Sequence, residues 1–358
     1  MALDSVTPST QSGLTPQQED EVLLRIYRAA LTCRIVDERM WVMARQGRAG
    51  FVLTPRGHEV AQVSAAAAMR IGLDSAWLYY RDMAAAIMLG VSPYELLLGC
   101  LGRADDPHSG GRQLSIHLSS PRLRIGTMSS AVAAHLPHAV GAAYASRVLG
   151  EDSVAVCLFG DGATSEGAAH EAMNFAGIHK LPIVFVCENN GYAISVPTSL
   201  QIAGESVAAR ARGYGMPGNR VDGTDARAVF TTVRQAIERA RAGGGPSIIE
   251  AMLPRITPHS SQDDDAYRTV EEHAAAEAAD PLPKLRRELE VRGLLDDESD
   301  RWMRDSITEE VEDAEQRAMS QPEAPPERAR RWLYAGDPEH SYLAELERQG
   351  PPSDATHD

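Results

Sequence analysis

Apolar residues along this chain change their spacing near residue 150, and the change predicts helices before that point and alternating helices and strands after it. Between Val22 and Leu31 the apolar positions recur at helical spacing. Thr15 offers an N-cap, Pro16 suits the first helical position, and Gln18 can complete a capping box. The pattern predicts a helix from Thr15 to Gly47.

Three further helices are predicted in this first part. An Ala-rich stretch over 59–70 has helical composition, and residues 92–95 (Ser-Pro-Tyr-Glu) form a second capping box that opens a short helix. Another helix is expected over 132–149. Pro137 should bend it, because proline lacks a backbone donor and clashes with the preceding turn.

Short apolar runs then mark buried strands. Residues 153–159 (SVAVCLF) are almost continuously apolar and end in glycine, as is typical of a buried parallel strand. A helix is expected over 166–178, and 183–187 (IVFVC) is a second strand. Strand, helix and strand in this order form a βαβ unit.

A second unit of this kind follows. It has a strand at Val221, a helix over 226–241 and a strand over 247–253, with a Gly-Gly-Gly-Pro break between the last two. Beyond residue 270 the chain is charged and helical. We therefore predict an α/β fold, with a doubly wound, mostly parallel sheet, helices on both faces and a helical C-terminal tail.

Three regions follow from this organisation. Residues 1–14 are polar and are expected to form a flexible arm. Residues 15–270 are expected to be the α/β domain. Residues 271–358 are expected to be a helical extension with a loose end.

Composition and charge restrict the classes of function. The formal charge of −15 argues against a nucleic-acid-binding surface. No apolar run approaches the roughly 18 residues of a membrane span, and the N-terminal residues lack a signal peptide's charged flank and apolar stretch. A cytoplasmic protein is expected. The four cysteines are widely spaced and predict neither disulfides nor a zinc site.

Polar side chains follow the two strands of the first unit. Asp161 lies between two glycines directly after the first strand, and Asn190 follows the second. Both strand ends meet at the same edge of a parallel sheet, where ligands bind. Carboxylate and amide oxygens suit Mg²⁺, and a helix N-terminus favours an anion. The pattern predicts a magnesium diphosphate site.

The spacing GDG, 26 residues, NN matches the motif of thiamin diphosphate-dependent enzymes. Over residues 16–345 the chain resembles the α subunit of the decarboxylase component of 2-oxo acid dehydrogenases, most closely the branched-chain type. The matching stretches are TPRGHEVAQV, YYRDMAAAIMLG, GRQLSIHLSS, TMSSAVAAHLPHAVGAAYA, FGDGATSEGAAHEAMNFA, ENNGYAISVPTS, RVDGTD and RITPHSSQDDDAYR. The resemblance implies a thiamin diphosphate-binding fold, with thiamin diphosphate and Mg²⁺ as cofactors.

The resemblance also implies roles for individual residues. The implied metal ligands are Asp161, Asn190 and the main-chain carbonyl of Tyr192. The implied cofactor contacts are Tyr80, Arg81, Ser130, Val132, Gly162, Ala163, Glu166 and His259. Phe51, Tyr79 and Val132 are candidates for the substrate pocket.

A loop over 255–268 carries the implied catalytic residue, His259, with Arg255 and Asp263 as residues that order the loop. Its two serines and three consecutive aspartates suggest that it cannot bury itself, so we expect it to be mobile until cofactor binds. A histidine pKa near neutrality would allow His259 either to steer the substrate carboxylate or to transfer a proton. Ser260 matches a kinase target of mammalian relatives.

The resemblance implies partners and a reaction. The glutamate that activates the cofactor belongs to a separate β subunit, so a heterotetramer of two α and two β chains is expected. The complex would decarboxylate a 2-oxo acid and pass the acyl group to the lipoyl domain of an acyltransferase. Ala134 and His135 replace oxygen donors of a potassium site, and Glu188 stands where mammalian members have arginine.

Several alternatives remain open. Pyruvate and acetoin dehydrogenase α subunits share the cofactor motif. A nicotinamide oxidoreductase fits the βαβ pattern but lacks the GxGxxG turn, and Asp161 would repel a pyrophosphate that has no metal. A noncatalytic assembly subunit would bind no cofactor.

Overall fold

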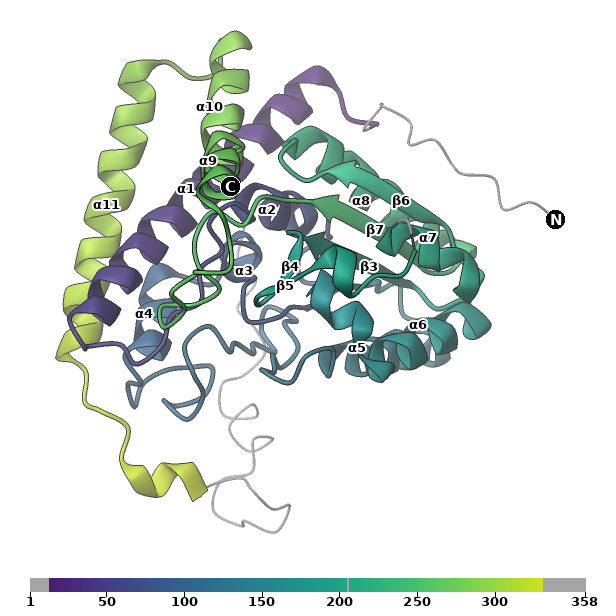
Figure 1. The fold of residues 1–358 in the computed structure, drawn as a ribbon, viewed down its shortest axis with the longest axis horizontal. Coiled ribbons are helices and arrows are strands. Elements are labelled where there is room, and N and C mark those ends of the chain that lie inside the picture. The colour runs from purple at the N-terminus through teal and green to yellow at the C-terminus, as the bar shows by residue number, and fades with distance from the viewer. Residues whose placement is uncertain (1–12, 205, 331–358) are drawn as a thin grey trace.

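A five-stranded parallel sheet forms the centre of the molecule (Figure 1). The computed structural model describes residues 13–204 and 206–330. In the order in which they lie in the sheet, the strands are β1 (Ser75–Trp77), β2 (Ala155–Gly160), β3 (Ile183–Asn189), β7 (Ser247–Met252) and β6 (Gly218–Asp222). A two-stranded hairpin lies beyond the end of β3 and consists of β4 (Tyr192–Ala193) and β5 (Val196–Pro197).

Alternate residues of the central strands enter two separate cores. Val184 and Val186 of β3 belong to one apolar cluster, whereas Phe185 and Cys187 belong to the other. The first cluster packs against α1 (Pro16–Arg45), α2 (Glu59–Ala67), α3 (Met83–Leu89), α4 (Pro93–Cys100) and α8 (Ala226–Arg239). The second packs against α5 (His135–Leu149), α6 (Gly167–His179) and the short α7 (Val207–Arg210). The predicted doubly wound sheet with helices on both faces is confirmed.

Local signals located most helix starts correctly. Both capping boxes are present, at Thr15 and at Ser92. The predicted bend at Pro137 is wrong, because α5 begins at His135 and Pro137 lies in its first turn, where no intrahelical donor is needed. The strands β1, β4 and β5 were not predicted, because two or three residues are too few to show a strand period.

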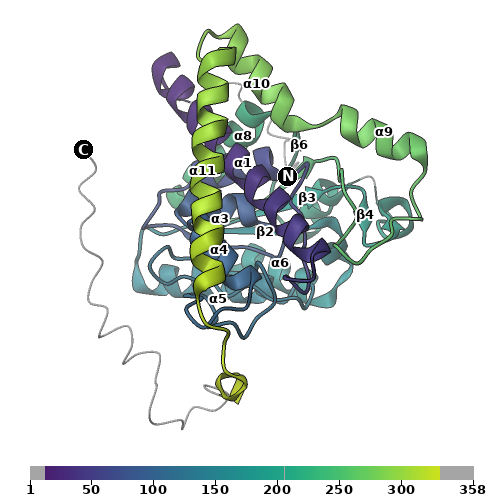
Figure 2. The same ribbon diagram turned by 90° about the vertical axis from the view of Figure 1, so that its left-hand side faces the viewer.

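The C-terminal part consists of α9 (Val270–Ala278), α10 (Pro281–Val291) and α11 (Asp297–Ser320). Leu289 of α10 and Val311 of α11 are buried in the first core. Figure 2 shows α11 running alongside α1, while α9 projects from the body of the molecule. The helical extension is therefore packed on the α/β domain. Residues 1–12 of the expected arm and 331–358 of the expected loose end lie outside the described residues.

All four cysteines, Cys33, Cys100, Cys157 and Cys187, are buried and unpaired, as predicted. No helix in the described ranges has both the length and the apolar composition needed to cross a bilayer.

Candidate functional site

The site lies at the edge of the sheet where β2 and β3 end side by side. Gly160 of β2 pairs with Glu188 of β3, so Asp161 and Asn190 emerge next to each other. Asp161 begins a 3-10 turn, is 1% exposed and accepts a hydrogen bond from Gln201 Nε2 at 2.6 Å. It also accepts a hydrogen bond from the backbone of Asn190. The structure therefore brings the two predicted metal ligands together.

The donor set suits a hard cation. Burial raises the pKa of Asp161, because the charged carboxylate is poorly solvated there, and a bound cation would stabilise the charged form. The carboxylate of Asp161, the amide oxygen of Asn190 and the carbonyl of Tyr192 are all oxygen donors, which Mg²⁺ prefers. Within the described residues no group of three or more His, Cys, Asp or Glu side chains could hold a metal ion, so an alternative centre of that kind was not found there.

Gly162 allows the hairpin to approach this turn. A Cβ atom at Gly162 would lie 2.9 Å from Cβ of Ala193 in β4. That separation is shorter than two carbon atoms tolerate, so a larger side chain at this position would push the hairpin away. Gly162 therefore helps to bring the chain segment with Tyr192 close to Asp161.

Arg81 is the feature that best fits a diphosphate. Its side chain is buried, with the residue 2% exposed, yet within the described residues it makes no ion pair. Its guanidinium donates to the carbonyl of Thr54 at 2.5 Å and to the carbonyl of His259 at 3.3 Å. A buried cation without a carboxylate partner is costly unless an anion completes the site. The forked guanidinium also matches phosphate geometry.

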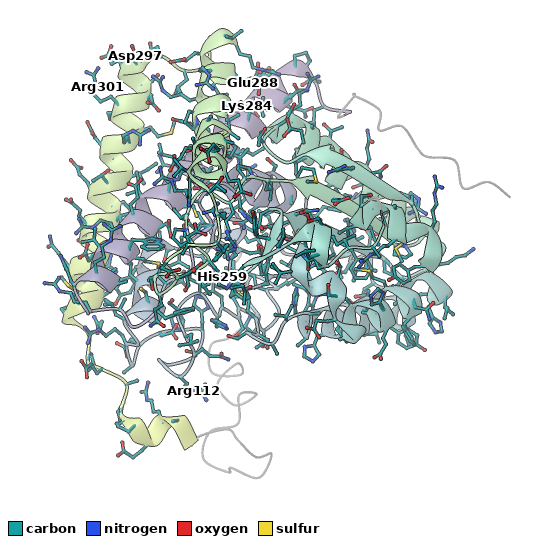
Figure 3. All side chains as sticks on the ribbon, in the orientation of Figure 1. Arg112, His259, Lys284, Glu288, Asp297 and Arg301 are labelled. Atoms are coloured by element: carbon teal, nitrogen blue, oxygen red, sulfur yellow. The ribbon has the colours of Figure 1, made fainter. Side chains whose placement is uncertain are left out.

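His259 lies beside Arg81, near the centre of the face seen in Figure 3. Arg81 Nη2 is 3.2 Å from Nδ1 of His259, and the Tyr80 ring packs edge-on against the imidazole. Burial, Arg81 and Arg255 lower the pKa of His259 to about 4. The expected near-neutral pKa is therefore wrong for this structure, because two guanidinium groups oppose a charged imidazole. Since Arg81 can only donate, Nδ1 accepts and Nε2 carries the proton.

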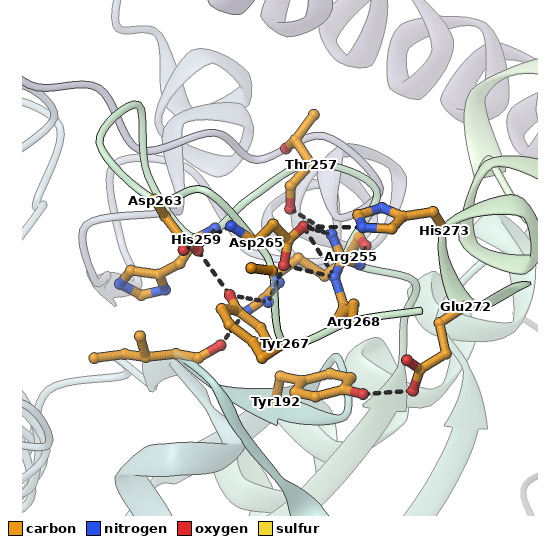
Figure 4. Close-up of polar contacts among 12 residues, drawn as sticks. Tyr192, Arg255, Thr257, His259, Asp263, Asp265, Tyr267, Arg268, Glu272 and His273 are labelled. Atoms are coloured by element: carbon orange, nitrogen blue, oxygen red, sulfur yellow. Dashed lines mark hydrogen bonds and ion pairs between the residues drawn. The ribbon is translucent and has the colours of Figure 1, made fainter. Parts of the chain in front are cut away.

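The loop over 255–268 is held by a buried ionic cluster (Figure 4). Asp265 is 4% exposed and pairs with both Arg255 and Arg268, the latter through Nε at 2.9 Å. The Arg255 guanidinium lies within cation–π distance of the rings of Tyr192 and Tyr267, at 5.2 and 5.4 Å from their centroids. The expectation that this loop cannot bury itself is wrong, because Asp265 compensates two buried arginines.

Among the described residues, Asp263 contacts the loop through hydrogen bonds and not through an ion pair. It accepts hydrogen bonds from the backbone N–H of His259 at 2.8 Å and from the Tyr267 hydroxyl at 2.7 Å, and is not paired with Arg255. The pKa of Asp263 is low because these donors outweigh its partial burial. Asp263 thus shapes the backbone at His259, while Asp265 carries the ion pairs.

The loop also contacts the hairpin at the metal site. Arg255 Nη1 donates to the carbonyl of Ile194 at 2.6 Å. Ile194 has a φ of 54°, which is strained for a β-branched residue and requires support of this kind. A cavity of about 430 Å³ opens beside this contact and is lined by Asn190, Tyr192, Arg268 and residues of α9. The loop, the hairpin and the strand ends therefore form one connected site.

A buried polar network next to Asn190 was missed by the sequence analysis. Glu188 Oε2 accepts from His58 Nδ1 at 2.8 Å, Gln62 Nε2 at 3.0 Å and the Tyr79 hydroxyl at 3.0 Å. Although burial alone would raise the pKa of Glu188, hydrogen bonds from His58, Asp82 and Gln62 lower it. Burial and the neighbouring Glu188 raise the pKa of Asp82, so Asp82 holds the proton of this carboxyl pair.

One signal could have revealed this network. His58 and Gln62 are four residues apart, so they share a face at the start of α2. Both are buried, and the helix sequence around them is rich in alanine. Polar residues on the apolar face of a helix need partners inside the protein. In the sequence, Glu188 stands out only as a departure from mammalian relatives, and no local pattern connects it with this helix.

The remaining predicted residues differ in their exposure to solvent. The Ser130 hydroxyl is hydrogen-bonded to Nε2 of His117 at 2.5 Å. His117 was not among the residues predicted for the site. Val132 is 47% exposed and Glu166 is exposed, whereas Ala163 is buried. Phe51 is half-buried and Tyr79 belongs to the Glu188 network. A shared pocket of Phe51, Tyr79 and Val132 stays a prediction.

Comparisons with known proteins agree with this architecture. A family model described as "Dehydrogenase E1 component" matches residues 27–327. The 2-oxoisovalerate dehydrogenase subunit alpha of Bacillus subtilis is 44% identical over 324 residues, which cover 90% of this chain and 97% of that protein.

Two further relatives come from distant organisms. The mitochondrial 2-oxoisovalerate dehydrogenase subunit alpha of Mus musculus is 39% identical, covering 88% of this chain and 72% of that protein. The 3-methyl-2-oxobutanoate dehydrogenase subunit alpha of Mycobacterium tuberculosis is 39% identical, and the match covers 80% of this chain and 76% of that protein. Because the family match and these similarities extend over most of the described chain, this protein belongs to the dehydrogenase E1 component family.

Proposed function

We propose that this chain is the α subunit of a branched-chain 2-oxo acid dehydrogenase and acts with thiamin diphosphate and Mg²⁺ in the oxidative decarboxylation of 2-oxoisovalerate. The convergence of Asp161 and Asn190, together with a buried Arg81 that makes no ion pair within the described residues, is the observation that carries the cofactor assignment. Similarity over 90% of the chain to a 2-oxoisovalerate dehydrogenase subunit supports the substrate.

Residues of this chain would hold the cofactor at its diphosphate end. Asp161, Asn190 and the Tyr192 carbonyl would bind Mg²⁺, and Arg81 would neutralise the phosphate charge. When bound, thiamin diphosphate supplies the electron sink that decarboxylation of a 2-oxo acid requires. Tyr80, Ser130, Val132, Gly162, Ala163 and Glu166 remain our predicted cofactor contacts.

His259 would orient the substrate. At neutral pH its imidazole is uncharged, with the proton on Nε2. Nε2–H can donate a hydrogen bond to the carboxylate of a 2-oxo acid, and neighbouring Arg81 adds positive charge. The low pKa makes the imidazole a weak base, so the structure favours carboxylate steering over proton removal by His259.

The chain would work with two partners. We propose that a β subunit completes the cofactor site in a heterotetramer and that a lipoyl domain accepts the acyl group. The subunit-alpha names of the relatives support a β partner. We expect the isolated chain to be inactive and the reconstituted complex to be active.

A substrate panel tests the proposal. The complex reconstituted with its β subunit should have the highest kcat/KM for 2-oxoisovalerate among 2-oxoisovalerate, pyruvate and acetoin. Preference for pyruvate or acetoin would replace the substrate assignment. An absence of Mg²⁺-dependent thiamin diphosphate binding would favour an assembly subunit, and NAD binding without Mg²⁺ would favour an oxidoreductase.

A further inference from the structure

The orientation of the Asn190 side-chain amide decides whether it can bind a metal ion. Its oxygen is a ligand for Mg²⁺, whereas its NH₂ group is only a hydrogen-bond donor. In the structure, Oδ1 accepts the backbone N–H of Tyr192 at 3.1 Å. Nδ2 lies 3.2 Å from Nε2 of His58. The two ends of the amide therefore have separate partners.

The other ring nitrogen of His58 explains why Nε2 acts as an acceptor. Nδ1 is 2.8 Å from Glu188 Oε2, an oxygen that also accepts from Gln62 and Tyr79. An oxygen surrounded by donors is itself an acceptor, so Nδ1 carries the imidazole proton. In the neutral imidazole Nε2 then accepts the N–H of Asn190.

The fold holds His58 at this place. His58 is the N-cap residue of α2 and follows Gly57, whose φ is 96°. A Cβ atom at Gly57 would lie 2.2 Å from the carbonyl oxygen of Pro254, just beyond β7. The turn thus packs tightly against the strand ends. His58 and Glu188 are each 1% exposed, so water has little access to replace their contacts.

We propose that His58, fixed by Glu188, is a positioning residue that turns the amide oxygen of Asn190 toward the metal ion. The inference rests on the proposed function, because it takes Asn190 as a Mg²⁺ ligand. It goes further by assigning a task to a histidine and a buried glutamate outside the metal-binding motif. Partners behind a ligand commonly set its orientation in this way.

Two substitutions of His58 separate this role from a structural one. In His58→Asn the amide can replace Nδ1 as donor to Glu188 but is too short to replace Nε2. In His58→Gln the longer side chain can present an oxygen near the former Nε2 and accept from Asn190. Both variants are neutral and polar, and their melting temperatures without cofactor report whether each one folds.

The measurement is a calorimetric titration of Mg²⁺ into the complex with the β subunit at a fixed excess of thiamin diphosphate, corrected for the heat of mixing Mg²⁺ with the free cofactor. His58→Asn should raise the Kd for Mg²⁺ by about 10- to 100-fold, while kcat at saturating Mg²⁺ stays within about twofold. His58→Gln should restore most of the affinity. Equal loss in both variants, or no loss in His58→Asn, would overturn the inference.

Combining His58→Asn with Asn190→Asp tests the orienting role of His58 without requiring that His58→Gln restore Mg²⁺ affinity. The carboxylate of Asn190→Asp has two equivalent oxygens, so its orientation no longer matters. His58→Asn should therefore have little additional effect on Mg²⁺ affinity in that background. An undiminished effect would contradict the orienting role. Asp161→Asn serves as the separate check of the metal site: unchanged Mg²⁺ affinity in that variant would reject the proposed function instead.

Discussion

Arg81 donates a hydrogen bond from Nη2 to Nδ1 of His259 across 3.2 Å, although the two residues are 178 positions apart. This contact connects the buried cation of the diphosphate site with the histidine of the loop. It also determines the tautomer of the neutral His259 ring. Because the arginine can donate but cannot accept a hydrogen bond, Nδ1 is the nitrogen without a proton. In the proposed function, cofactor binding and substrate orientation would therefore share this pair of side chains.

The first prediction concerns the charge of His259. Its pKa of about 4 is below the ordinary value, so the folded protein should lose stability as the pH falls from about 6.5 toward 4, where the unfolded chain binds the proton more readily. Histidine-selective NMR of the cofactor-free protein should show the neutral Nε2–H form at pH 7. Arg81→Gln should raise the pKa of His259.

A His259→Asn variant identifies the resonance in that experiment. A titration of His259 near pH 6.5 in the unmodified protein would contradict the electrostatic argument. No change of its pKa in Arg81→Gln would show that Arg81 does not contribute to the low pKa of His259.

The second prediction concerns Asp161. Asp161→Asn should abolish Mg²⁺-dependent binding of thiamin diphosphate, because the amide cannot neutralise the metal. The cofactor-free protein should keep its melting temperature, since burial raises the pKa of Asp161 and the charged carboxylate is unfavourable without a cation. Calorimetry and thermal unfolding provide the two measurements, and the exposed Asp152→Asn is the control.

The third prediction concerns the ion pairs of the loop. Asp265→Asn leaves Arg255 and Arg268 without their shared carboxylate, a loss of the kind that costs about 3–5 kcal/mol at a buried pair. Limited proteolysis should cut within 255–268 much faster than in the unmodified protein. Asp264→Asn, at the neighbouring exposed aspartate, should cleave at the original rate.

Acid should have the same effect as Asp265→Asn. Because its arginine partners lower the pKa of Asp265 despite burial, the stabilisation is fully present above about pH 4. It should be lost as the pH falls through the lowered pKa. Equal cleavage of both aspartate variants at neutral pH would reject Asp265 as the residue that holds the loop.

The fourth prediction concerns Ser260. This serine is 6% exposed, and its Oγ accepts the backbone N–H of Gln262. Ser260→Glu places a carboxylate near Asp263 and should therefore lower activity and make the loop more open to protease than in the unmodified protein, both without and with Mg²⁺ and thiamin diphosphate. Ser260→Gln has the same size without the charge. Full activity and protection in Ser260→Glu would show that negative charge at this position does not disturb the loop.

The fifth prediction concerns the packing of the C-terminal helices. Arg34 of α1 is buried and binds Asp280, the N-cap of α10, through both terminal nitrogens at 2.9 and 3.0 Å. Asp280→Ala should lower the free energy of unfolding by about 3 kcal/mol or more, because Arg34 stays buried with Glu59 alone. The exposed Asp305→Ala should change it by less than about 0.5 kcal/mol. Denaturant unfolding measures both, and equal stabilities would show that the Arg34–Asp280 pair does not stabilise the protein.

The amino-acid sequence by itself determined the layered α/β architecture and the convergence of Asp161 and Asn190, the predicted metal ligands. Apolar periodicity is a local property, so the buried strands β2, β3 and β7 and their helices could be predicted with errors of a few residues. Because parallel strands end at the same edge of a sheet, the spacing of Asp161 and Asn190 was enough to predict that they converge.

Tertiary structure alone decided which polar groups meet. His58 and Glu188 are 130 positions apart, and the sequence around each residue does not predict their contact. Three aspartates are consecutive in the sequence, and only the fold of the loop decides their contacts. Asp265 pairs with the arginines, whereas Asp263 accepts the backbone N–H of His259. The low pKa of His259 likewise arises from burial beside Arg81 and Arg255, since electrostatic environment depends on distance in space and not along the chain.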